Sequence, residues 1–104
     1  PSSQFFYFRS LSREKANYKK VCEDLDNAIV LEPDNARYYY DRGLLKFKQY
    51  RILREEYPDQ KLDWLEEKAG ISLDPCPDLE EATILEEEYM KTLTKCDFFK
   101  KQIH

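Results

Sequence analysis

The sequence has few of the residues from which common active sites are built. Its 104 residues include one histidine, which is the last residue, and only two glycines. A single terminal histidine leaves no positioned base for a serine or cysteine nucleophile. Two glycines are too few for a glycine-rich phosphate-binding loop. We therefore expect a chain that is not an enzyme and that binds no cofactor.

Cysteine is also scarce, and its three copies are far apart. Cys22, Cys76 and Cys96 form no CxxC pair, and with a single histidine they predict no metal site. An odd number of distant cysteines, with Cys22 on an apolar helix face, is typical of reduced, buried thiols. The sequence therefore predicts a reducing, cytoplasmic location, either in the cytosol or in a cytoskeletal or other large assembly.

Long apolar runs and a basic excess are missing too. No run approaches the ~20 residues needed to cross a bilayer, so no membrane partner is expected. The formal net charge of −4 argues against nucleic acid as the main partner, because phosphate binding needs a basic excess. The chain begins at Pro1 and its only methionine is Met90, which suggests a piece of a longer protein.

What the sequence does contain is the apolar spacing of amphipathic helices. Between residues 17 and 31 the apolar positions stand three and four apart, which places them on one helical face. Pro33 ends this helix, and Asp34 or Asn35 can cap a second helix that begins at Ala36. Two amphipathic helices joined by so short a turn predict an antiparallel pair. Further helices are predicted in residues 1–16, from Asp59 or Gln60 to 73, and at about 79–102.

Residues 28–43 resemble the junction between two tetratricopeptide repeats. Residues 28–33, Ala-Ile-Val-Leu-Glu-Pro, match the small residue, leucine pair, acid and proline that end a repeat, and Tyr39 and Gly43 match the opening of the next. The resemblance implies that Ala28 and Gly43 are small where helices touch, that Tyr39 fills the space between neighbours and that Pro33 turns the chain. Residues 71–75 repeat the pattern of residues 29–33, so a second unit would end at Pro75.

The fold implied by this resemblance is all-α. It is a right-handed stack of antiparallel helix pairs, an α-solenoid fragment closed by a C-terminal capping helix. We expect a first, degenerate pair in residues 1–33, a lengthened second pair in residues 34–75 and the capping helix in residues 76–104. The 42 residues from Pro33 to Pro75 (75 minus 33) exceed the ~34 of one repeat, which predicts about one extra turn in each helix of the second pair.

In this family, the first helix of each pair lines a concave groove that holds partner peptides. Carried over by position, the predicted groove residues are Arg37, Tyr40, Asp41, Leu44, Phe47 and Lys48. Asp41 stands where chaperone-binding members hold a terminal carboxylate with asparagine, and an acid there would repel that carboxylate. We therefore expect a protein-interaction module or scaffold that is not a carboxylate clamp for heat-shock chaperones.

The charges of this helix leave several functions open. Between positions 37 and 54, six basic residues stand against Asp41 alone: Arg37, Arg42, Lys46, Lys48, Arg51 and Arg54. They either pair with acids of the last helix or dock an acidic protein surface. The acids of the last helix are either a solvated face or a site for a basic partner. Interleaved aromatic residues leave an RNA-binding helical repeat as one alternative. The regulatory domain of a multisubunit enzyme is another.

The first residues predict self-association. Phe5, Phe6 and Phe8 would lie at the open end of the array, where no neighbouring repeat covers them. An isolated fragment should then dimerise, aggregate or need more chain.

Overall fold

The computed structural model describes residues 2–14 and 17–103, and this part of the chain contains helices and no β-strand. The α-helices are α1 (Ser3–Ser12), α2 (Tyr18–Leu31), α3 (Ala36–Glu56), α4 (Leu62–Ala69), α5 (Cys76–Leu85) and α6 (Leu93–Ile103), with the 3₁₀ helix η2 (Glu87–Thr92) before α6. The all-α class is therefore confirmed. No helix in the described residues is both long enough and apolar enough to cross a membrane.

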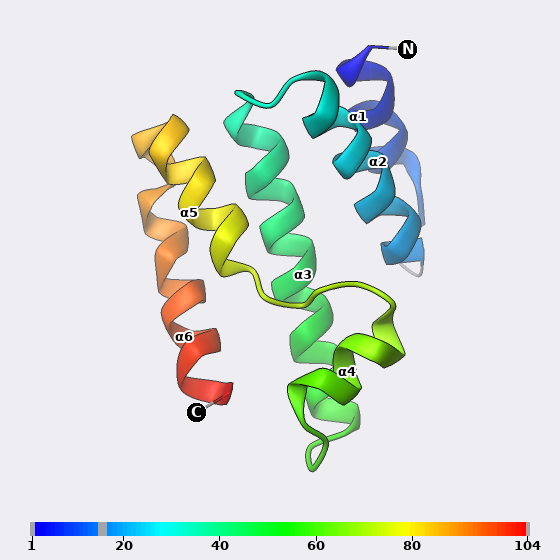
Figure 1. The fold of residues 1–104 in the computed structure, drawn as a ribbon, viewed down its shortest axis with the longest axis vertical. Coiled ribbons are helices and arrows are strands. Elements are labelled where there is room, and N and C mark those ends of the chain that lie inside the picture. The colour runs from blue at the N-terminus through cyan, green and yellow to red at the C-terminus, as the bar shows by residue number, and fades with distance from the viewer. Residues whose placement is uncertain (1, 15–16, 104) are drawn as a thin grey trace.

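Helices α1, α2 and α3 follow one another as antiparallel neighbours (Figure 1). A buried acid fastens the first two, because the carboxylate of Asp24 on α2 accepts from Arg9 Nη2 at 2.7 Å and from Arg13 Nε at 2.6 Å. Burial alone would raise the pKa of Asp24, but the hydrogen bonds and charges of Arg13 and Arg9 outweigh it and lower that pKa. The predicted helix in residues 1–16 is thus present and ion-paired to α2.

The turn between α2 and α3 has the predicted chemistry. Asn35 caps α3, since its Oδ1 accepts from the Arg37 N–H at 3.1 Å. The Tyr39 hydroxyl donates to the Pro33 carbonyl at 2.8 Å and so spans the turn. Ala28 is fully buried near the end of α2. The antiparallel pair expected from Pro33 and the flanking periodicity is present.

Gly43 allows a close approach, but of a different helix from the one expected. A Cβ on Gly43 would lie 2.7 Å from Leu79 Cδ2 and 3.2 Å from Asp78 Cβ, and both residues belong to α5. Gly43 is thus small where two helices touch, as the resemblance implies, but the helix that touches it is α5. The glycine is needed because α5 lies close alongside the first half of α3 (Figure 1).

The lengthening of the second pair is confined to one helix. Helix α3 has 21 residues and α4 only 8, so the prediction of about one extra turn in each is wrong. Gly70 ends α4 in the left-handed conformation with φ of 72°, and its N–H donates to the Glu66 carbonyl at 2.8 Å. Helix α4 stops at Gly70, so residues 71–75 are not helical. They differ in this from residues 29–33, whose pattern they repeat, because residues 29–31 form the last turn of α2. Pro75 is buried at the entrance to α5.

The C-terminal segment is a helical hairpin and not the single capping helix that was predicted. Helix α5 ends at Leu85, Glu86 is extended (φ −143°, ψ 115°), and the chain returns through η2 and α6 beside α5 (Figure 1). Three consecutive glutamates, residues 86–88, stand at the break, and Glu88 raises the pKa of Glu86.

The largest core cluster lies where α3, α4 and α6 meet. Its buried members are Phe47, Tyr50, Leu53, Leu65, Ala69, Leu73, Cys76, Cys96 and Phe99. The rings of Tyr50 and Phe99 pack edge to face with centroids 4.8 Å apart. This cluster holds α6 against the second half of α3.

Candidate functional site

The six predicted groove residues all lie on α3, but the structure divides them into two groups. Arg37, Tyr40 and Asp41 lie on its first half. Leu44, Phe47 and Lys48 line a groove farther along, between α3 and α6.

The first group packs against other helices. Arg37 Nε lies 3.0 Å from Asp41 Oδ1, and the ring of Tyr40 stacks on that of Tyr89 in η2 with centroids 4.6 Å apart. Burial raises the pKa of Asp41, and its interactions with the Tyr7 hydroxyl and with Arg37 only partly oppose this. These side chains therefore join α3 to α1 and η2, and Asp41 is already engaged within the chain.

The second group belongs to a groove of about 620 Å³, which we call the α3–α6 groove. Its apolar lining consists of Leu44, Phe47, Tyr50, Ile52 and Phe98. Its charged and polar lining consists of Lys48, Arg51, Arg54, Glu55, Lys95 and Gln102. Sequence reasoning identified part of the α3 wall and missed the α6 wall.

Apolar surface in this groove is open to solvent. Phe98 is 43% exposed and Ile52 is 47% exposed, although both are large apolar residues. The rings of Phe47 and Phe98 meet edge to face across the groove, with centroids 5.9 Å apart. An exposed apolar floor of this kind favours association with another apolar surface.

The cations of the groove have aromatic neighbours and no carboxylate partner. The Arg51 guanidinium lies 5.8 Å from the ring centres of both Phe47 and Phe98, and Lys95 Nζ lies 5.9 Å from that of Phe47. Within residues 2–14 and 17–103, no carboxylate lies at ion-pair distance from Lys48, Arg51, Arg54 or Lys95. Four cations against Glu55 give the groove a positive charge in a chain of net charge −4.

Other cations of α3 are paired inside the chain. Arg42 Nη2 lies 2.7 Å from Asp78 Oδ1, Arg42 Nη1 lies 2.7 Å from Asp26 Oδ1, and Lys46 Nζ lies 3.1 Å from Asp78 Oδ2. Burial acts to lower the pKa of Arg42, but Asp78 and Asp26 raise it further than burial lowers it. Arg42 and Lys46 thus pair with an acid of the C-terminal segment, as one of the two alternatives predicted. Arg37 pairs instead with Asp41 on its own helix, and the cations of the groove form no ion pair within the described residues.

Asp78 has a different role from the one its sequence context suggests. The spacing from Asp78 to Glu81 predicts a capping box, yet α5 already begins at Cys76 and residue 75 makes no side-chain cap. The Asp78 carboxylate instead accepts from Arg42 Nε at 2.9 Å and from Arg42 Nη2 at 2.7 Å. A bidentate pair of this kind, between the buried Asp78 and the half-buried Arg42, fixes the position of α5 on α3.

Two of the three cysteines are joined, which overturns the prediction of three reduced thiols. Cys76 at the start of α5 and Cys96 on α6 form a disulfide with a Cα–Cα distance of 5.0 Å. The hairpin brings them together, and this could not be read from a sequence in which one helix was expected. Cys22 is free and buried, as predicted, and burial raises its pKa to about 11.

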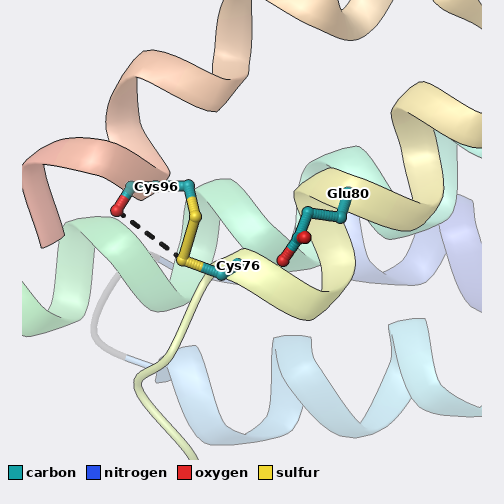
Figure 2. A group of neighbouring side chains, drawn as sticks. All are labelled: Cys76, Glu80 and Cys96. Atoms are coloured by element: carbon teal, nitrogen blue, oxygen red, sulfur yellow. Dashed lines mark hydrogen bonds between the residues drawn. A yellow bond between two sulfur atoms is a disulfide. The ribbon is translucent and has the colours of Figure 1, made fainter. Parts of the chain in front are cut away.

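The disulfide lies beside the group of side chains that comes nearest to a metal-binding arrangement. Cys76, Glu80 and Cys96 place one ligand atom each within 4.8 Å of the others (Figure 2). Thiolates, and not disulfide sulfurs, are the species that bind metal ions. In the disulfide form this group has no thiolate to offer, so its role is to fasten α5 to α6.

Comparison with known protein families, curated proteins and solved structures finds no match for this chain. The resemblance to tetratricopeptide repeats therefore depends on the residues of the junction alone. The proposal for function therefore rests on the charges and apolar side chains of the α3–α6 groove.

Proposed function

We propose that this chain is a protein-interaction module and that the α3–α6 groove captures an acidic segment of a partner protein. The observation that carries the proposal is the combination of four cations without a carboxylate partner and an exposed apolar floor. Within the described residues Lys48, Arg51 and Lys95 make no side-chain hydrogen bond or ion pair, so they are available for charge-assisted bonds to a partner. Arg54 adds positive charge to the groove, although its guanidinium already donates to the carbonyls of Pro58 and Gln60.

The two kinds of surface would contribute differently to binding. Burying Phe98 and Ile52 against apolar side chains would supply most of the affinity. The positive charge would speed association with acidic partners and disfavour basic ones. Leu44, Phe47 and Lys48 are the part of the predicted groove that this proposal uses.

A role as a scaffold within a larger assembly fits the resemblance to tetratricopeptide repeats. The short turn at Pro33 and the antiparallel order of α1, α2 and α3 support a repeat-like arrangement over the first half of the chain. Partner capture would then take place on the second half of α3, away from the position of the carboxylate clamp.

Single-stranded RNA is the second candidate, because basic grooves with aromatic side chains also bind nucleic acid. The cations near Phe47 and Phe98 favour this reading, and the overall negative charge opposes it. Oligouridine affinity would fall steeply with salt, since phosphate binding releases counterions. Affinity for an acidic, apolar peptide would fall less with salt, because salt does not screen the burial of apolar surface.

Selection from a display library of random peptides of about 12 residues tests the proposal. The wild-type protein should enrich peptides that carry acids beside apolar residues. Reversing the groove charge with Lys48→Glu and Arg51→Glu should lower their affinity about tenfold or more, which is about 1.4 kcal/mol, and should shift selection toward basic peptides. Lys100→Glu is the matched control, since Lys100 is exposed on α6 and does not line the groove.

Two results would contradict the proposal. One is that the wild type and the charge-reversed variant both enrich peptides irrespective of peptide charge. The other is oligouridine binding that competes with every selected peptide and disappears at moderate salt, which would assign the groove to RNA.

A further inference from the structure

We infer that the α3–α6 groove takes an amphipathic α-helix of about three turns, with acids beside its apolar stripe. This inference rests on the proposed function and specifies the secondary structure of the partner segment. Three features of the groove support it: its length, the nature of its walls and the spacing of its cations.

The length of the groove matches a short helix. On α3, the lining residues run from Leu44 to Glu55, and at 1.5 Å per residue this span is about 17 Å. About three helical turns have this length. On the other wall, Lys95 and Gln102 mark a span of about 10 Å along α6.

The walls favour a helix over an extended peptide. Both walls are α-helices, whose main-chain N–H and C=O groups are already bonded within each helix except near the ends. An extended segment lying in the groove would find no main-chain partners and would lose water from its own amide groups, which is costly. A helix satisfies its own amides and presents only side chains.

The cations are spaced at helical intervals. Lys48 and Arg51 lie three residues apart on α3, and Lys95 lies opposite them on α6. Arg54 stands three residues farther along α3, but its guanidinium already donates to the Pro58 and Gln60 carbonyls. Acids spaced three or four residues apart on a partner helix would stand about 5–6 Å from one another, close to the spacing of these cations. The apolar stripe between those acids would cover Phe98 and Ile52.

Two synthetic peptides of identical composition, about 14 residues of leucine, glutamate and alanine, test the inference. In the first, leucines recur every three to four residues with glutamates beside them, and a side-chain staple holds the helix. In the second, the same residues alternate in an extended pattern of period two. Fluorescence anisotropy at moderate salt measures both affinities. We expect the helical peptide to bind at least about tenfold more tightly.

Variants and controls locate the binding. Phe98→Ala and the pair Lys48→Glu with Arg51→Glu should each weaken helical-peptide binding about tenfold, whereas Lys100→Glu should leave it unchanged. Circular dichroism and melting temperature confirm that each variant is folded. An unstapled version of the helical peptide should gain helical circular dichroism on binding, and a proline at its centre should abolish binding.

The outcomes separate the inference from the proposed function. Equal or tighter binding of the extended isomer, still lost on charge reversal, would overturn the helical partner and leave acidic capture intact. Failure of both acidic peptides to bind would overturn the proposed function and this inference with it. A dimer of the protein that the same charge reversals dissociate, seen by sedimentation velocity, would assign the groove to a second copy and overturn a foreign helix.

Discussion

Reducing the Cys76–Cys96 disulfide should remove about 3 kcal/mol from the free energy of unfolding. The bond joins residues 20 positions apart, and closing a loop of that size in the unfolded chain corresponds to about 3 kcal/mol. Both half-cystines are buried, at 4% and 3% exposure, so alanine at both positions fits the core without placing a polar group there. For a domain of this size, the loss corresponds to a fall in melting temperature of about 12–20 °C.

Urea denaturation followed by circular dichroism, with and without dithiothreitol, measures this loss. The reductant should destabilise the wild type and a Cys22→Ala control by the same amount. It should leave a Cys76→Ala/Cys96→Ala double variant unchanged, and that variant should resemble the reduced wild type. Cys22→Ala is a suitable control because Cys22 is the free, buried thiol.

The reasoning would be refuted by equal stability of the wild type with and without reductant. Mass spectrometry gives an independent check, because alkylation in denaturant without reductant should label one cysteine. Labelling of all three would show that the thiols are reduced, as the cysteine spacing first suggested.

Three further predictions concern single side chains. Gly43→Ala should lower the urea midpoint, because a Cβ 2.7 Å from the buried Leu79 side chain overpacks the core by about 1–3 kcal/mol, which exceeds or cancels a gain of about 1 kcal/mol in helix propensity. A higher midpoint would contradict the α3–α5 contact. Asp41→Asn should raise the melting temperature at neutral pH, because burial raises the pKa of Asp41 and disfavours its charged form. The difference should shrink as pH falls through the raised pKa and vanish below the ordinary carboxyl pKa of the unfolded chain, and a constant difference would argue against this cause. Cys22 should resist alkylation by iodoacetamide at pH 8 in the native protein, because burial raises the pKa of its thiol to about 11. The thiol should react once the protein is unfolded. Rapid labelling of the native protein would show that the thiol is accessible.

The first half of the fold could be predicted because its signals are local. Pro33 and Asn35 mark the end of one helix and the start of the next within a few residues, and the apolar spacing on either side is regular. The sequence of α3 contains no helix-breaking residue before Pro58, and the helix ends two residues earlier, at Glu56. Such features depend on backbone and capping preferences that act at short range.

The second half could not be predicted, because nonlocal contacts decide it. Apolar residues from Leu79 to Phe99 keep a helical spacing straight through the break at Glu86, so periodicity alone predicts one helix. Gly70 could be a close contact or a weak point by sequence, and only its positive φ shows that it ends α4. The chain turns back at Glu86, and this turn places α6 beside α3. No pattern in the sequence predicted the turn, so none predicted that Phe98 would line the groove.

The ion pairs of Arg42 have a consequence for how the chain can be divided. In a modular array each unit touches only its neighbours, so a unit can be excised without disturbing distant ones. Here a single guanidinium joins Asp26 and Asp78, which come from the first and last of the three segments expected from the sequence. Ending the chain at Pro75 would remove Asp78 from both Arg42 and Lys46, and would leave Arg42 with Asp26 alone. The smallest piece that can stand alone therefore extends beyond the apparent repeats and includes the closing hairpin.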